Sequence, residues 1–135
     1  MDDHKVLGII DEFWRHRLAG DKAAVVSFLS PGATYELVGA NAFADPVAVG
    51  PTADAVRAAH KLIDDFRFHG MKQLAAVVEG RKAAVVSKVE VSFRGGSPVT
   101  TEICDFWEFD DKGKVQSLKQ FVDTHLLHGM LHGAS

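Results

Sequence analysis

The chain has 135 residues, of which 47% are hydrophobic and 24% charged, and its formal net charge is −3. This length and composition are typical of one globular domain, here residues 1–135, that builds its core without disulfides or metal. The chain has no cluster of Lys and Arg and no apolar run near the ~18 residues of a membrane span, which argues against nucleic-acid and membrane partners.

Helical spacing dominates the first part of the chain. Asp2 and Asp3 are both suited to cap a first helix, whose apolar stripe consists of Val6, Leu7, Ile10, Phe13, Trp14 and Leu18. Gly20 suits the left-handed position after a helix. Asp21 then caps a second, short helix that is predicted to run to about Leu29.

A short strand and an unusual loop come next. Pro31-Gly32 is predicted to end the second helix, and residues 33–38 form a strand with Tyr35 and Leu37 on one side. Residues 39–51 are rich in Gly, Ala, Pro and Val and almost free of charge. Loops of this length are often lids or pocket rims, and we expect such a role here.

A third helix is predicted to begin at Thr52 or Asp54. Its core-facing residues are expected to be Val56, Ala59, Leu62 and Ile63. His60 lies beside that face, where it could act as a base near neutral pH; a surface or satisfied core histidine is the more common case.

From Phe66 onward the pattern is that of strands. The first, residues 66–78, is expected to be irregular at Gly70, and strands 83–94, 99–109 and 115–123 follow after short turns. In the second, Val85, Val89, Val91 and Phe93 are expected inside, with Lys88, Glu90, Ser92 and Arg94 outside. The tail, residues 124–135, is predicted to be a frayed helical turn. The order gives an α+β fold: a curved antiparallel sheet, shaped as a cone, with three N-terminal helices enclosing a cavity.

Asp105 is the most informative residue in these strands. In the run from 99 to 109 it shares a face with Ile103 and Trp107, so a carboxylate stands among apolar side chains. A buried ionised carboxylate is costly unless it is paired, protonated or lines a cavity. The pattern therefore predicts a small-molecule pocket with Asp105 as a proton or hydrogen-bond donor. The alternatives are an aspartate bonded to a neighbouring group, or a strand whose two faces are reversed.

The whole chain resembles the nuclear transport factor 2-like superfamily, in its SnoaL-like and ketosteroid-isomerase-like branch. The likeness rests on the order and spacing of Ala19-Gly-Asp21, Ala33-Thr-Tyr-Glu-Leu37, the run 103–115 and Phe121-Val-Asp-Thr124, none of which is specific alone. The resemblance implies the cone-shaped fold. It does not by itself fix a function, because one fold hosts many chemistries.

Ketosteroid isomerases of this superfamily use a base aspartate, an oxyanion tyrosine and a protonated aspartic acid, which is a standard example of pKa tuning. By similarity Asp105 falls on the protonated aspartic acid. Phe13 falls on the tyrosine and has no hydroxyl, and Leu37 falls on the base and cannot take a proton. The usual steroid isomerase mechanism is therefore not expected.

Two related groups suggest other residues. The resemblance to SnoaL-like cyclases implies an acid/base aspartate late in the sheet, and limonene-epoxide hydrolases use an Asp–Arg–Asp group with Tyr and Asn. Here Asp105 and Asp123 are the available carboxylates, Tyr35 the phenol and Gln120 a polar partner. Strand alternation turns Gln120 inward and Asp123 outward unless a bulge or the strand end reverses it. Arginines such as Arg94 are expected on the wet face, so the hydrolase group does not assemble convincingly.

The candidate site therefore has two parts. Its catalytic residues are Asp105, Tyr35 and Asp123, and its ligand-binding residues are Phe13, Trp14, Leu37, His60, Trp107 and Gln120. For the aromatic residues a plain core role is the common alternative. No metal site is expected, since the tail histidines His125, His128 and His132 are best read as solvated. No cofactor is expected either, because the chain has no phosphate loop or dinucleotide fingerprint.

Two functions remain open at this level. The first is a cofactor-independent isomerase or cyclase that moves a proton next to a carbonyl of a small hydrophobic molecule, with an epoxide hydrolase less favoured. The second is a non-catalytic ligand-binding or dimerisation module. The resemblance implies a homodimer through the outer sheet face, where Cys104 and Phe106 lie. A single cysteine and an acidic start unlike a signal peptide lead us to expect a cytoplasmic protein.

Overall fold

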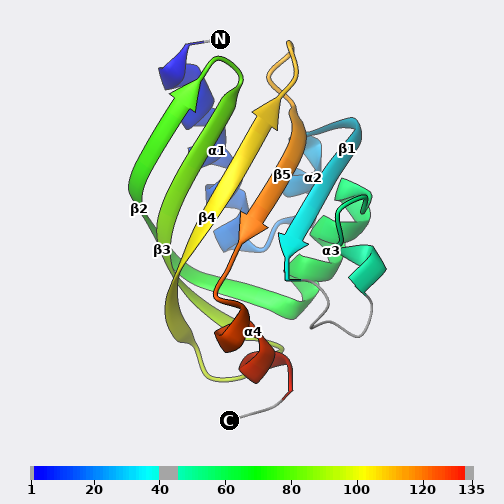
Figure 1. Cartoon of the computed structure of the whole chain (residues 1–135), viewed down its shortest axis with the longest axis vertical. Coiled ribbons are helices and arrows are strands. Elements are labelled where there is room, and N and C mark those ends of the chain that lie inside the picture. Colours follow the sequence, from blue (N-terminus) through cyan, green and yellow to red (C-terminus); the bar gives the residue numbers. More distant parts are fainter. Residues whose placement is uncertain (1, 40–45, 133–135) are drawn as a thin grey trace.

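The computed structural model describes residues 2–39 and 46–132. It contains, in chain order, α1 (Asp3–Ala19), α2 (Lys22–Ser27), β1 (Leu29–Val38), η2 (Pro46–Ala48), α3 (Ala55–Asp65), β2 (Phe66–Glu79), β3 (Lys82–Phe93), β4 (Val99–Phe109), β5 (Val115–Phe121) and α4 (Thr124–Leu131) (Figure 1). Residues 40–45 of the loop 39–51, which was expected to act as a lid or pocket rim, lie outside the described residues.

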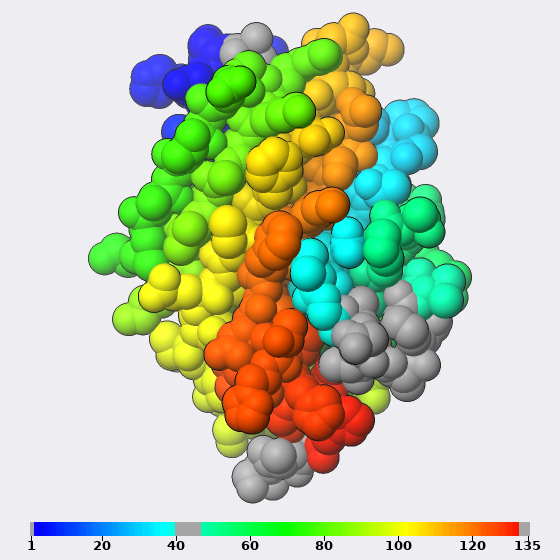
Figure 2. Space-filling model, viewed as in Figure 1, coloured from blue at the N-terminus to red at the C-terminus, as the bar shows by residue number. Residues whose placement is uncertain are grey.

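The five strands form one curved, unclosed sheet in the order β1-β5-β4-β3-β2. Strands β2 to β5 are antiparallel neighbours, as expected for a meander, whereas β1 pairs with β5 in parallel. Helices α1, α2 and α3 pack on one face of the sheet (Figure 1). Helix α4 lies at the end of the sheet near the C-terminus (Figures 1 and 2). The predicted α+β cone with N-terminal helices is confirmed. One pair, β1–β5, departs from the all-antiparallel expectation.

The helix ends follow the predicted capping residues. The side chains of Asp2, Asp21 and Asp54 each accept a backbone N–H bond at the start of α1, α2 and α3. Gly20 has φ of 72° after α1, in the left-handed region where a side chain is strained. These short-range features are encoded locally, which is why the sequence identifies them.

The second helix and the first strand have different bounds from those predicted. α2 ends at Ser27 rather than near Leu29, and β1 starts at Leu29, so Pro31-Gly32 lies inside a strand. The register of β1 against β5 shifts between Leu29 and Thr34, and Gly32 has φ of 75°. The pair that was expected to separate two elements instead forms an irregularity within one.

The third helix buries a different stripe from the one expected. Ala55, Ala58, Ala59 and Leu62 are buried, whereas Val56 is 40% exposed and Ile63 only half-buried. The prediction for Val56 was wrong because alanines, which carry little hydrophobic signal, make up most of the packed face. His60 is exposed on this helix.

The long strands follow their predicted alternation, with one exception. The irregularity at Gly70 is confirmed as a register shift after Phe68. Ile103, Asp105, Trp107 and Phe109 of β4 all point inward. Ser92, expected outside, is only 4% exposed, and its hydroxyl lies 2.8 Å from His69 Nε2. Arg94 follows β3 with φ of 46° and pairs with Asp65.

The tail contains more structure than predicted. Asp123 caps α4, an eight-residue helix, and Leu127 of α4 is buried against the core. The expectation of a frayed turn was wrong because burial of an apolar face stabilises a helix too short to persist alone. Among the described residues no helix is long and apolar enough to cross a membrane.

Candidate functional site

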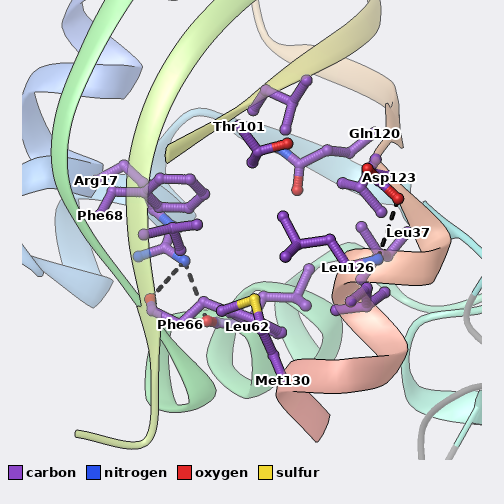
Figure 3. A pocket seen from close by; sticks show the side chains of 14 residues that line it. Arg17, Leu37, Leu62, Phe66, Phe68, Thr101, Gln120, Asp123, Leu126 and Met130 are labelled. Carbon is purple, nitrogen blue, oxygen red and sulfur yellow. Dashed lines mark hydrogen bonds between the residues drawn. The ribbon is translucent and has the colours of Figure 1, made fainter. Parts of the chain in front are cut away.

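A cavity opens between the inner face of the sheet and the C-terminal helix (Figure 3). The cavity and the open solvent at its mouth together span about 500 Å³. Its walls come from nearly every layer of the fold: Arg17, Leu37, Leu62, Phe66, Phe68, Val91, Thr101, Ile103, Gln120, Val122, Asp123, Leu126, Leu127 and Met130. Apolar side chains dominate this lining, and the few polar groups stand out against them, as in many small-molecule sites.

A buried polar group lies at the inner end of this lining. Asp105 and Gln120 are paired across β4 and β5, are 1% and 6% exposed, and are hydrogen-bonded through their side chains. The Tyr35 hydroxyl, on β1, donates to Gln120 Oε1 over a long 3.4 Å. Because the amide oxygen accepts from Tyr35, its nitrogen is the group that faces Asp105, and a second N–H remains on that nitrogen.

The surroundings of Asp105 favour its protonated form. Burial raises the pKa of this carboxyl from 3.8 to about 7, and the bond from Gln120 opposes the rise. Its Oδ1 atom has no hydrogen-bond partner among the described residues. Burial likewise raises the pKa of Tyr35 well above its ordinary value, so this phenol stays protonated. A carboxyl with a pKa about 7 can take up or release a proton near neutral pH.

Arg17 is the second notable polar group, and it lies on α1. It is 5% exposed, and its Nη2 donates to the carbonyl oxygens of Leu62 and Phe66 at 3.0 and 2.9 Å. Its guanidinium carbon lies 4.6 Å from the centre of the Phe68 ring. Burial lowers the pKa of Arg17. The side chain thus brings a positive charge to the wall of an otherwise apolar cavity.

Only some of the predicted site residues line the cavity. Leu37, Gln120 and Asp123 do. Asp123 is exposed, and its carboxylate accepts the Leu126 N–H at 3.0 Å as the cap of α4. Asp105 and Tyr35 are not part of the lining and connect to it through Gln120.

The predicted aromatic wall forms a cluster deeper in the core. Phe13 lies edge-on to Trp107 at 4.9 Å between ring centres, and Trp14 lies edge-on to Phe68 at 5.0 Å. Phe13, Trp14 and Trp107 are buried but do not line the cavity, and Phe68 alone of these rings does. The indole N–H groups of both tryptophans have no partner among the described residues. His60, exposed on α3, is not part of the cavity wall either.

Arg17 is the functional candidate that the sequence reasoning missed. It follows Phe13 by four residues and Trp14 by three, so it continues the stripe of Val6 and Ile10 on the buried face of α1. That spacing was a usable signal: a charged residue on an apolar helix stripe. The wall formed by α4 was missed as well, because the tail was not expected to form a packed helix.

No metal site is evident in the part of the chain that the structure describes, where no group of three or more His, Cys, Asp or Glu side chains could hold an ion. His125, His128 and His132 are exposed on or after α4. The rings of His128 and His132 are 4.2 Å apart.

The comparisons with known proteins agree with this fold. The family model for the SnoaL-like domain matches residues 10–118, so the chain belongs to the SnoaL-like family of the nuclear transport factor 2-like superfamily. No curated protein matches the chain.

Several solved structures share the fold at low sequence identity. A candidate isomerase from Rhodopseudomonas palustris has a TM-score of 0.76 at 14% identity, covering 98% of this chain and 99% of its own. An epoxide hydrolase from M. tuberculosis, of the limonene-epoxide hydrolase-like type, has a TM-score of 0.68 at 17% identity, covering 97% and 92%. SalBIII, an epoxide hydrolase/cyclase-like enzyme with a role in pyran ring formation in the polyether salinomycin, has a TM-score of 0.69 at 20% identity. The match covers 92% of this chain and 95% of SalBIII. At these identities the likeness establishes the fold alone.

Proposed function

We propose that the chain binds a small hydrophobic molecule in this cavity and catalyses proton transfer next to its carbonyl group, as an isomerase or cyclase without cofactor. The observation that carries the proposal is Asp105: a buried carboxyl with a pKa about 7, bonded through Gln120 to the wall of an apolar cavity. A group with that pKa works in both directions near neutral pH. Structural neighbours described as isomerase and cyclase-like enzymes support the reaction class.

Each residue has a defined role in this proposal. When the ligand enters, Gln120 turns so that its second N–H bonds the ligand's carbonyl oxygen and the Asp105 carboxylate meets the adjacent carbon. Asp105 takes a proton from that carbon, and the electrons of the broken C–H bond form an enolate held by Gln120. In an isomerisation the enolate is conjugated with a neighbouring C=C bond of the ligand, and Asp105 returns the proton to the far carbon of that system. In a cyclisation the enolate carbon attacks a second carbonyl, and Asp105 protonates the new alkoxide.

The test is deuterium exchange at the carbon beside a carbonyl, followed by NMR for a panel of small ketones in D₂O. The wild-type chain is expected to accelerate exchange, and Asp105→Asn to lose at least about 100-fold of that acceleration. Glu102→Gln is the matched control, because it removes an exposed carboxylate from the outer face of the same strand. Full activity in Asp105→Asn would eliminate the assigned role.

A non-catalytic binding protein is the second candidate, and one observation favours it. Asp105 does not line the cavity, so a ligand that leaves Gln120 in place never touches the carboxyl. Tight binding without exchange across the ketone panel would select this candidate. An epoxide hydrolase is less favoured, since no described arginine is paired with Asp105 to form an Asp–Arg–Asp group.

A further inference from the structure

Arg17 has hydrogen-bonding capacity that the protein itself leaves unused. A guanidinium carries five N–H donors on three nitrogens, and both bonds of Arg17 come from Nη2. Nε and Nη1 make no hydrogen bond with any described residue. Only about 5% of the residue is exposed. Arg17 lines the cavity, where a ligand can offer an acceptor to these nitrogens.

The charge of Arg17 is also uncompensated. Its two acceptors are neutral carbonyls near the C-terminal end of α3, where the helix dipole supplies a partial negative charge only. Among the described residues no carboxylate forms an ion pair with it. A buried cation without a partner is costly, and a ligand that brings the opposite charge regains much of that cost.

The positions of the other polar groups restrict how a ligand can lie. Arg17 stands beside Phe68 on one side of the cavity, while Gln120 and Thr101 lie at another (Figure 3). Among the described residues of the lining, Asp123 is the one other charged side chain. It is exposed and caps α4, whereas Arg17 is buried at the wall.

We infer that Arg17 binds the carboxylate of a small hydrophobic acid, so that the cavity takes monocarboxylates in preference to neutral molecules of the same length. The acid's two oxygens accept from the guanidinium, and its chain lies along Leu62, Phe66 and Phe68. Its far end reaches towards Gln120. This assignment names the ligand class of the proposed function and rests on the same cavity.

Equilibrium binding tests the inference without requiring any reaction. Octanoate, octanamide and octanol are titrated into the wild-type chain at pH 7.5 by calorimetry and ¹⁵N NMR, with hexanoate and dodecanoate as shorter and longer acids. At least one acid is expected to bind about 10-fold or more tightly than its amide and alcohol, since hydrogen bonds to charged groups are the stronger class. The Arg17 side-chain N–H signal is expected to shift. Equal affinity for acid and alcohol, or no binding by any acid, overturns the inference.

Two variants connect the preference to Arg17. Arg17→Met keeps the bulk and is expected to bring the acid-to-alcohol affinity ratio to about one, whereas Arg17→Lys keeps the charge and part of the ratio. If Arg17→Met fails to fold, because it also loses the bonds to α3, Arg17→Lys and the wild-type series still decide. If the acid-to-alcohol affinity ratio is unchanged in a folded Arg17→Met variant, the role of Arg17 is only to bind the end of α3, and the inference is overturned. Asp105→Asn is expected to keep the acid-to-alcohol affinity ratio. A failure of the proposed proton transfer in the ketone exchange test is therefore distinguishable from a failure of the proposed carboxylate binding.

Discussion

Asp105 and Gln120 stand opposite each other in the β4–β5 ladder, yet only Gln120 reaches the cavity. The Asp105 carboxyl lies behind the Gln120 side-chain amide. The amide nitrogen donates a hydrogen bond to the carboxyl, and the amide oxygen accepts one from the Tyr35 hydroxyl. Any ligand in the cavity therefore meets Asp105 through Gln120, or after Gln120 has moved. This relationship makes the protonation state of Asp105 and the position of Gln120 interdependent.

The raised pKa of Asp105 predicts how stability depends on pH. The folded pKa is about 7 and the ordinary value 3.8, so between these values the folded state binds more protons than the unfolded state. The free energy of unfolding contributed by this group is therefore greatest below about pH 4 and falls as the pH rises towards about 7. The difference of about three pH units between the two pKa values corresponds to a loss on the order of 4 kcal/mol in the free energy of unfolding.

Urea unfolding at pH 5 and at pH 8, on the wild type and Asp105→Asn, measures this dependence. The variant has no carboxyl to ionise, so its stability is expected to fall less between the two pH values. The comparison cancels the contributions of all other titrating groups. An identical pH slope in both chains would mean that Asp105 is not held protonated by burial.

Replacing Gln120 by Leu is expected to raise the pKa of Asp105 further. The hydrogen bond from the Gln120 side chain lowers that pKa in the wild type. Its loss leaves the carboxyl among apolar atoms. The pKa can be followed by ¹³C NMR of the labelled carboxyl during a pH titration. Tyr35→Phe is the matched control: it removes only the long 3.4 Å bond to Gln120 and should change stability by about 1 kcal/mol or less. A lower or unchanged pKa in Gln120→Leu would contradict the proposed pairing.

The sequence predicted most of the fold because strand alternation and helix caps are local. The inward face of β4 follows directly from its period of two, and Asp2, Asp21 and Asp54 cap helices as their positions indicate. The bounds of β1 could not be predicted in the same way. Pro31-Gly32 normally breaks an element, and only pairing with β5 keeps the chain extended through it.

The site was predictable only in part, because it depends on contacts far apart in the chain. Asp105 and Gln120 were identifiable from strand alternation, but no local pattern shows that Gln120 separates Asp105 from the cavity. Arg17 could have been found from its place on the apolar stripe of α1. The hydrogen bonds of Arg17 to carbonyl groups 45 and 49 residues away could not have been predicted, because they form only once the end of α3 lies beside α1.

The aromatic cluster is expected to support stability, with Phe13 as its centre. Phe13 contacts the rings of Trp14, Phe28 and Trp107 edge-on. Phe13→Ala is expected to lower the free energy of unfolding by about 3–5 kcal/mol. Leu37→Ala serves as the comparison, because Leu37 is equally buried but lines the cavity, so it should change ligand affinity as well. Urea unfolding and octanoate titration of both variants check this. A loss of stability in Phe13→Ala below 1 kcal/mol would contradict the role.

The outer face of the sheet is proposed as a homodimer interface. Phe121, at 45% exposed, lies opposite Cys104 on that face, and the half-buried Phe106 is two residues further along β4. Sedimentation velocity at micromolar concentration is expected to show a dimer in the wild type and a monomer in Phe106→Lys. Val47→Lys changes another exposed apolar residue, 72% exposed in η2 and not part of the sheet, and should leave the dimer intact. A monomeric wild type would remove the proposal.

Gly39 is expected to set the position of α4 and, through it, the cavity mouth. Its φ is 92°, and an added Cβ would meet the Thr124 methyl group at 2.5 Å, at the first residue of α4. Gly32 has a similar φ of 75°, but a Cβ there meets nothing within 4 Å. Gly39→Ala and Gly32→Ala therefore carry similar backbone strain, about 1–2 kcal/mol, and differ mainly in the clash with Thr124.

Gly39→Ala should displace α4, whose Leu126, Leu127 and Met130 line the cavity, and weaken octanoate binding several-fold. Gly32→Ala should lower the melting temperature without changing the affinity. Equal effects of the two variants on binding would show that α4 does not depend on this contact.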